Sequence, residues 1–235
     1  MDYATLLALL GEGSAHPGGF QATKELIGRI KLPPGTKVLE AGCGTGRTAC
    51  YLAGLGCDVT AMDRNASMIE KAKQRAGLAG ASIRIIQADA ASMPFPDGAF
   101  DVVLVESVTA FTEGGSALRE YRRVLKPGGV LYDHEMALAR KLPPSRLREL
   151  RSFYGLRHLR TVPEWLKLVR ESRFRKLKVS RFAPMDQPAI DRDSFRVIER
   201  ELLLNREALR MMMKNERLMN KFSKLMGGIV ITAWK

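Results

Sequence analysis

Three acidic residues accompany apolar stretches in the first half of the chain, and each could contact a ligand. Glu40 lies inside the first of these stretches, and Asp63 and Asp89 end the next two. A carboxylate can accept hydrogen bonds from ribose hydroxyls or from the amine of adenine, and it attracts a cationic group. Because carboxylates repel phosphates, the three acids favour a positively charged adenosine compound over one that carries a pyrophosphate.

A glycine-rich turn follows the first apolar stretch. Gly42, Gly44 and Gly46 are spaced two residues apart. Glycine suits a turn that needs a positive φ or the close approach of a ligand. The dinucleotide fingerprint Gly-x-Gly-x-x-Gly places its third glycine where this chain has Arg47. A bulky residue there argues against NAD as the ligand of this turn.

Bringing these residues together requires a sheet whose strand ends meet at one edge. Apolar strands alternate with helical stretches from residue 37 onward, which predicts an α/β fold with a Rossmann-like, doubly wound and mostly parallel sheet. Ligands of such sheets bind at the carboxyl ends of the strands. The expected strands are 37–42, 57–63, 83–89, 100–107, 130–136, 176–182 and 229–234.

We expect a single domain over residues 1–235, with residues 37–138 as its cofactor-binding core. Residues 1–32 are expected to form a helical lid, and residues 140–175 a basic helical segment. Apolar residues recur at helical spacing further on, so residues 186–227 are expected to be a helical insertion before the last strand. This insertion would serve as a substrate cap or as a dimer interface.

The chain is strongly basic, with a net charge of +13. This charge predicts an anionic binding partner, such as an acidic substrate, a membrane surface or nucleic acid. Residues 119–181 contain 18 Lys or Arg and 6 Asp or Glu. No apolar run is long enough to span a bilayer. The cysteines suggest neither a disulfide framework nor a metal site, because no Cys-x-x-Cys pair or histidine cluster accompanies them. We therefore expect a reduced, cytoplasmic protein with no resident metal.

Taken together, several motifs resemble those of the class I S-adenosylmethionine-dependent methyltransferases, close to the small-molecule and ubiquinone/menaquinone-biosynthesis branch. The resemblance covers about 100 of the 235 residues. It implies a seven-stranded sheet with an antiparallel last strand. The matching motifs are VLEAGCGTG at 38–46, TAMD at 60–63, QADA at 87–90, FPDGAFD at 95–101 and EYRRVLKPGG at 120–129.

The resemblance also implies a cofactor, S-adenosyl-L-methionine, and its product, S-adenosyl-L-homocysteine. By position in the motifs, the first glycine turn would hold the methionine part, Asp63 the ribose, and Asp89 the adenine edge. The residues expected to bind the cofactor are Glu40, Gly42, Cys43, Gly44, Gly46, Asp63, Arg64, Met68, Asp89, Ala90 and Glu106.

Methyl transfer from a sulfonium is a direct displacement, so the enzyme must align the acceptor and, where the acceptor carries a proton, remove it. His134 and Glu106 are the predicted catalytic residues, and the intrinsic pKa of histidine favours His134 as the base. The alternative is a histidine that is hydrogen-bonded in the sheet. The residues expected to contact substrate are His16, Phe20, Gln21, Phe111 and Glu135.

The leading hypothesis is methyl transfer to an oxygen, nitrogen or carbon atom of a small molecule that is anionic or partly apolar. One alternative is RNA methylation through the basic region 119–181, although few aromatic residues are interleaved with its charges. Another is a non-catalytic, cofactor-binding interaction protein. The methionine-rich insertion leaves contact with a membrane surface and formation of a homodimer open.

Overall fold

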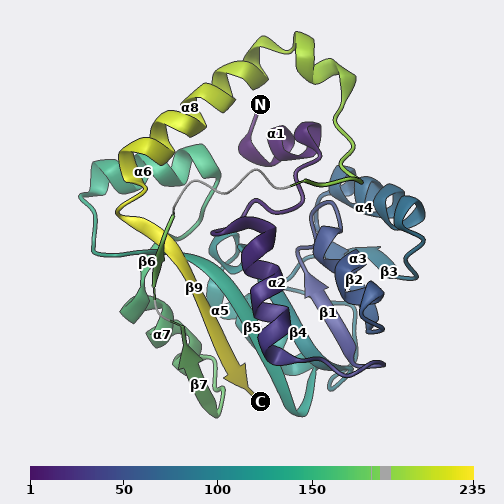
Figure 1. Cartoon of the computed structure of the whole chain (residues 1–235). Helices are drawn as coiled ribbons and strands as arrows, with labels where there is room; N and C mark the ends of the chain where they lie inside the picture. The colour runs from purple at the N-terminus through teal and green to yellow at the C-terminus, as the bar shows by residue number, and fades with distance from the viewer. Residues whose placement is uncertain (181, 186–191) are drawn as a thin grey trace.

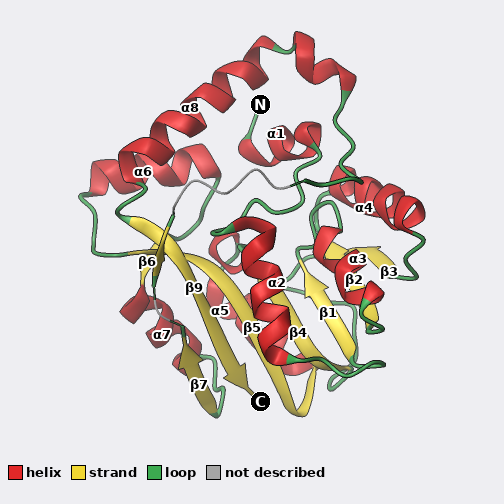
Figure 2. Ribbon diagram, in the orientation of Figure 1, coloured by secondary structure: helices red, strands yellow, loops and turns green. Residues whose placement is uncertain are grey.

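The computed structural model describes residues 1–180, 182–185 and 192–235, and Figure 1 shows their path from the N-terminus to the C-terminus. A central sheet carries helices on both faces and a helical cap above the carboxyl ends of its parallel strands (Figure 2). None of the described helices is long and apolar enough to cross a membrane.

The sheet has seven strands along its main path, in the order β3-β2-β1-β4-β5-β9-β7. Strands β1 to β5 are parallel to one another, whereas β9 runs antiparallel between β5 and β7. This arrangement confirms the expected fold class. The strands are β1 (Lys37–Ala41), β2 (Asp58–Asp63), β3 (Arg84–Gln87), β4 (Phe100–Glu106), β5 (Leu125–Leu138), β7 (Lys176–Val179) and β9 (Met226–Trp234). Two strands of two residues, β6 (Arg160–Thr161) and β8 (Ala183–Pro184), pair with β5 and β9.

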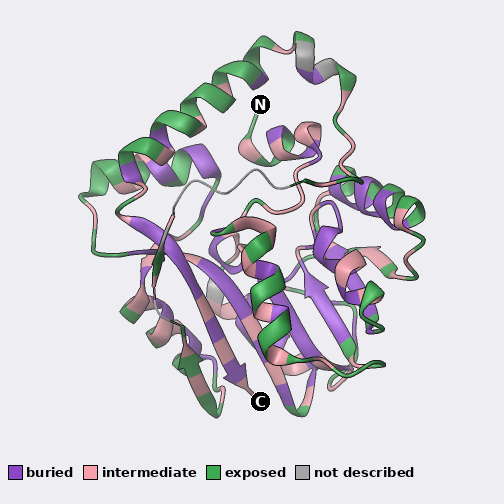
Figure 3. Ribbon diagram, in the orientation of Figure 1, coloured by how far each residue is buried: buried purple, intermediate pink, exposed green. Residues whose placement is uncertain are grey.

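The helices bury their apolar sides against both faces of the sheet. On one face, α2 (Gly19–Ile30), α3 (Arg47–Gly54) and α4 (Ala66–Ala79) contribute to a hydrophobic cluster with β1, β2 and β4. On the other, α5 (Gly114–Val124) and α7 (Val162–Glu171) contribute to the main core, in which Trp165 and Tyr121 are fully buried. Burying both faces explains the continuous apolar runs of the central strands (Figure 3).

A cap of three helices covers the carboxyl edge: α1 (Tyr3–Leu10), α6 (Pro144–Tyr154) and α8 (Arg206–Phe222). Tyr3 on α1 contacts two aromatic residues of α6. The centroid of its ring lies 5.6 Å from that of Phe153 and 4.9 Å from that of Tyr154. The hydroxyl of Tyr154 in turn donates to Asn215 on α8, at 3.0 Å. The N-terminal helix is thus held over the sheet by residues from the second half of the chain.

The helical insertion expected over 186–227 is only partly helical. Residues 192–199 contain no helix, a short 3-10 turn η2 (Arg200–Leu204) follows, and α8 begins only after Asn205, whose side chain caps it by accepting from the N–H of Ala208. The apolar spacing in the sequence did not predict this non-helical segment, because ion pairs hold residues 192–199 against α4. Residues 186–191 lie outside the described part of the chain. In the basic helical segment expected over 140–175, the first helix ends at Tyr154, because Gly155 adopts a φ of 73°.

Candidate active site

A cavity of about 300 Å³ lies between the carboxyl edge of the sheet and the N-terminal helix. Its floor comes from the ends of β1, β2 and β4 and from the loop after β3, and its roof includes Tyr3, Leu7 and His16. The ends of parallel strands meet here because β1 pairs with both β2 and β4. We call the part near Asp63 and Asp89 the cofactor end and the part near His16 and Glu106 the acceptor end.

The cofactor end presents a half-buried carboxylate, Asp63, and a buried one, Glu40, which differ in their hydrogen bonding. Asp63 accepts from the backbone N–H of Gly44 at 3.0 Å and of Asn65 at 2.9 Å, and burial raises its pKa. Glu40 is 4 % exposed, and its Oε2 has no hydrogen-bond partner among the described residues. Burial and the nearby charge of Glu106 raise the pKa of Glu40 well above its ordinary value. A buried carboxylate oxygen without a partner is costly, so the free oxygen of Glu40 suits a cationic ligand group.

The glycine turn leaves room for that ligand. Gly44 has a φ of 52°, and a Cβ added there would meet nothing within 4 Å. At Gly42, which has a φ of 79°, a Cβ would lie 2.1 Å from a methyl carbon of Val108. Gly46 is not on the cavity wall, and a Cβ there would lie 3.0 Å from that of Ala72. The absence of a side chain at Gly46 therefore allows α3 to pack closely against α4.

The structure brings together ten of the eleven residues expected to bind the cofactor. Gly46 is the exception. The carboxylate oxygen of Glu40 that lacks a partner fits the charged amino-acid portion of an adenosine compound. The open space over Gly44 allows the close approach of such a compound. The ten that line the cavity are Glu40, Gly42, Cys43, Gly44, Asp63, Arg64, Met68, Asp89, Ala90 and Glu106.

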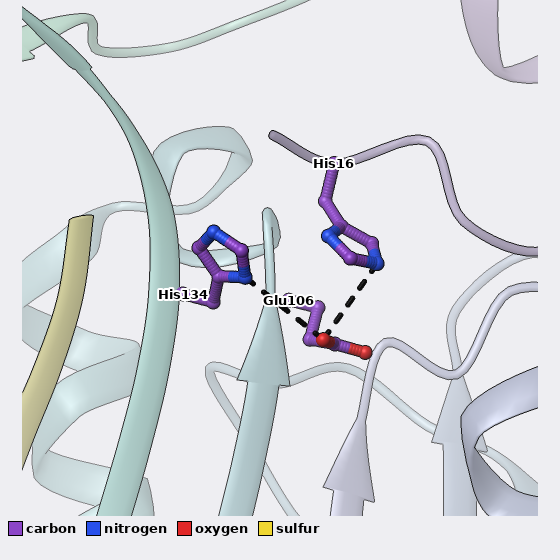
Figure 4. A group of neighbouring side chains, drawn as sticks. All are labelled: His16, Glu106 and His134. Atoms are coloured by element: carbon purple, nitrogen blue, oxygen red, sulfur yellow. Dashed lines mark ion pairs between the residues drawn. The ribbon is translucent and has the colours of Figure 1, made fainter. Parts of the chain in front are cut away.

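The acceptor end is centred on Glu106, whose side chain is 7 % exposed. One carboxylate oxygen accepts from the hydroxyl of Thr23 at 2.6 Å, and the other from that of Thr48 at 2.8 Å. Two histidines flank the carboxylate: Nε2 of His16 lies 3.6 Å, and Nδ1 of His134 4.0 Å, from the same oxygen (Figure 4). The lid, β4 and β5 each supply one member of this group.

The predicted base, His134, is not on the cavity wall. Burial and the neighbouring His16 lower its pKa to about 4, although Glu106 acts in the opposite direction. The imidazole is therefore neutral at physiological pH and reaches the cavity only past Glu106. Its direct role as a base stays a prediction, whereas Glu106 lines the cavity itself.

Two of the five residues expected to contact substrate, His16 and Phe111, line the cavity. Phe20 instead packs against Tyr51 at 5.5 Å between ring centroids, and Gln21 donates to Glu25 on the exposed side of α2.

Glu135 lies beneath the acceptor end, fully buried, where it accepts from the backbone N–H groups of Val108 and Thr109. Burial and the adjacent Asp133 raise its pKa well above the ordinary value. This residue therefore supports the loop after β4 and does not face a substrate.

Several site residues have no signal in the sequence. Thr23 lies on a helix remote from the motifs and reaches Glu106 only because α2 packs across the sheet. Ser107, by contrast, ends an expected strand beside Glu106 and is a candidate from that place alone. It lines the cavity with a φ of 56°, and its hydroxyl has no partner among the described residues. A non-glycine residue in this conformation is uncommon and often lies at a functional site.

A strap, residues 192–199, ties the lid to the core. Asp193 makes two hydrogen bonds with Arg75 on α4, at 2.6 and 2.8 Å. Burial opposes the charge of Asp193, but Arg75 and Arg47 outweigh it and hold the pKa below its ordinary value. Further along, the side chain of Arg196 donates to the carbonyl of Leu10 at the end of α1. An ion pair outside the cavity therefore helps to hold the lid over it.

Comparison with known proteins adds evidence on family. Residues 39–133 match a family described as a methyltransferase domain. The chain is 36 % identical to the uncharacterized methyltransferase YodH of Bacillus subtilis over 99 % of both chains. It is 28 % identical to phosphoethanolamine N-methyltransferase 1 of Arabidopsis thaliana, over 97 % of this chain but only 44 % of that relative.

Among solved structures, the fold is similar to phosphoethanolamine N-methyltransferase 2 of Haemonchus contortus in complex with S-adenosyl-L-methionine. The TM-score is 0.77 at 19 % identity, over 99 % of this chain and 57 % of that one. The fold is also similar to the cyclase SpnF, with a TM-score of 0.74 at 22 % identity, over 99 % of this chain and 92 % of that one. At these identities the structures establish the fold alone, and the cyclase shows that the fold hosts different activities.

Proposed function

The chain belongs to the class I S-adenosylmethionine-dependent methyltransferases, and from this premise we propose that its acceptor is a small, uncharged or cationic molecule with an amine or hydroxyl nucleophile. The observation that carries the proposal is the charge of the cavity. Among the described residues its wall contains one lysine or arginine, Arg64, which lies at the cofactor end. The acids on the same wall are Asp2, Glu12, Glu40, Asp63, Asp89 and Glu106.

This charge argues against a phosphorylated or carboxylated acceptor. An anion entering the acceptor end would meet Glu106 and Glu12 without a lysine or arginine to offset its charge. An amine or hydroxyl can instead donate a hydrogen bond to Glu106. The positive balance of residues 119–181 does not change this argument, because none of those residues lines the cavity.

When bound, the cofactor would supply a methyl group activated by its sulfonium, with the thioether of S-adenosyl-L-homocysteine as the leaving group. The residues of this chain would hold and orient the two reactants. Glu40 offers its unpaired oxygen to the positive end of the cofactor, and Asp63 offers its carboxylate to the ribose. Glu106, fixed by Thr23 and Thr48, orients the nucleophile and takes its proton.

A methyl-transfer assay with paired acceptors tests the proposal. The full-length chain is incubated with methyl-labelled S-adenosyl-L-methionine and either ethanolamine-type amines and alcohols or their phosphorylated counterparts. We expect label in the unphosphorylated members and little in the phosphorylated ones. Faster labelling of a phosphorylated member than of its partner would overturn the charge argument.

Two alternatives give different outcomes in the same assay. An RNA methyltransferase would label RNA and leave small acceptors unlabelled, and its binding would weaken steeply with salt. A cofactor-binding protein without methyl transfer would bind S-adenosyl-L-homocysteine and label neither. The cavity under the cap favours a small acceptor over RNA. A cytoplasmic location is part of the proposal, since the three cysteines carry free thiols.

A further inference from the structure

We propose that His16, Glu106 and His134 form a binding site for a divalent first-row transition metal ion at the acceptor end of the cavity. One ligand atom from each residue lies within 4.8 Å of the others. Two imidazoles and one carboxylate are a common ligand set for zinc and for non-haem iron. The sequence predicted no resident metal, because the two histidines are 118 residues apart and show no ligand spacing.

The three side chains are aimed at one point. In Figure 4 the imidazoles approach the same end of the Glu106 carboxylate from opposite sides. Their side chains are 4 %, 7 % and 5 % exposed for His16, Glu106 and His134. Glu106 and His134 are also register partners in the pairing of β4 with β5, so two of the ligands sit on rigid strands.

The hydrogen bonding of His134 supplies an independent observation. Its Nδ1 is buried and has no hydrogen-bond partner among the described residues. The opposite ring atom, Nε2, faces β9, where a Cβ on Gly228 would lie 3.0 Å away. A buried imidazole nitrogen without a partner is costly, and a metal ion beside Glu106 would satisfy it.

The hydrogen bonds of Glu106 leave it able to bind a metal. Each carboxylate oxygen has two lone pairs, and the hydroxyls of Thr23 and Thr48 use one on each oxygen. These hydroxyls would orient the ligand, as groups behind metal ligands commonly do. Donors around one zinc ion lie about 3.4 Å apart, so the group must close by about 1 Å. His16 belongs to the lid, so this closure would draw the lid onto the sheet.

The site would also refine the acceptor. A metal with open positions facing the cavity would bind an oxygen or nitrogen nucleophile directly and would lower the pKa of a bound hydroxyl, so that in the metal-bound protein Glu106 would hold the metal that activates the nucleophile. That role rests on the proposed function, whereas metal binding itself does not. Calorimetry with metal alone, and separately with S-adenosyl-L-homocysteine alone, therefore distinguishes the failure of one from the failure of the other.

The test is a titration of the chelator-treated, full-length protein with Zn²⁺. We expect one ion per chain, and at least about tenfold weaker binding in His134→Ala and in His16→Ala. His158→Ala is the matched control and should bind as the original chain does, because His158 lies outside the group and is half-exposed. His16 lies outside the sheet, so its variant tests the site even where His134→Ala does not fold.

Cobalt gives a second readout. Co²⁺ should produce visible d–d absorption without a thiolate-to-metal charge-transfer band, and His16→Ala should weaken that absorption. Absence of stoichiometric zinc binding would overturn the proposal. A charge-transfer band, or binding unchanged in both histidine variants, would assign the metal to the cysteines or the surface and would overturn it equally.

Discussion

At the cofactor end of the cavity, Glu40 and Asp63 come from adjacent parallel strands, and the glycine turn that they surround is continuous with β1. At the acceptor end, Glu106 receives its contacts from the loop that carries His16, from α2, from α3 and from β5. The first arrangement depends on one turn and one strand pairing. The arrangement at the acceptor end depends on how four separate segments pack. The residues at the acceptor end can therefore change while the cofactor end stays the same.

From this comparison we expect substitutions at the acceptor end to lower the rate of catalysis, and substitutions at the cofactor end to lower the affinity for the cofactor. The largest effect is expected for Glu106→Gln, which should lower kcat by about 10²–10⁴-fold, because an amide cannot take the proton of the acceptor. The affinity for S-adenosyl-L-homocysteine, measured by calorimetry, should change by less than about threefold.

Glu113→Gln is the control for this variant, since Glu113 is exposed and pairs with Arg157 outside the cavity. An equal loss of turnover in both variants, or a large loss of cofactor affinity in Glu106→Gln alone, would erase the distinction between the two ends.

Asp63→Ala should weaken S-adenosyl-L-homocysteine by about 100-fold, because a charged hydrogen-bond partner of the ribose is worth about 1.5–3 kcal/mol. Asp58→Ala, at the exposed start of the same strand, should leave the affinity unchanged. The affinity of the original chain should also fall as the pH drops through the pKa of Asp63. Since burial raises that pKa, the fall begins at a higher pH than for an exposed aspartate.

The strap predicts a smaller effect that is confined to kinetics. Asp193→Asn removes the negative partner of Arg75 and should speed the dissociation of S-adenosyl-L-homocysteine by about tenfold, because breaking a buried ion pair is costly. Stopped-flow displacement measures this rate. Glu171→Gln, an exposed residue on α7, is the control. An unchanged dissociation rate would show that the strap does not restrain the lid.

The smallest effect is expected for Thr23, which positions Glu106. Thr23→Val keeps the shape but loses the hydroxyl, and a lost hydrogen bond of about 1 kcal/mol corresponds to a fall of about fivefold in kcat. Thr23→Ser keeps the donor and should restore the rate. If Thr23→Ser were as slow as Thr23→Val, the threonine would act through packing and not through its hydrogen bond.

The cofactor end and the fold could be predicted from patterns of residues that lie close together in the sequence. Strand–helix alternation, the glycines and the acids at the strand ends place ten expected residues on one cavity wall. Residues 192–199 could not be predicted in the same way. Their apolar spacing favours a helix, but Asp193 and Glu199 form ion pairs with Arg75 and Lys71, and these tertiary contacts outweigh local propensity.

The sequence by itself determined the sheet, the glycine turn and the class of cofactor, because each of these rests on contacts between residues close in the chain or on adjacent parallel strands. Only the tertiary structure decided the acceptor end. It placed Thr23 against Glu106, buried His134 beside it and brought His16 from the lid to the same carboxylate. Those contacts join residues 28 to 90 positions apart, and no local pattern records which distant segments will pack together.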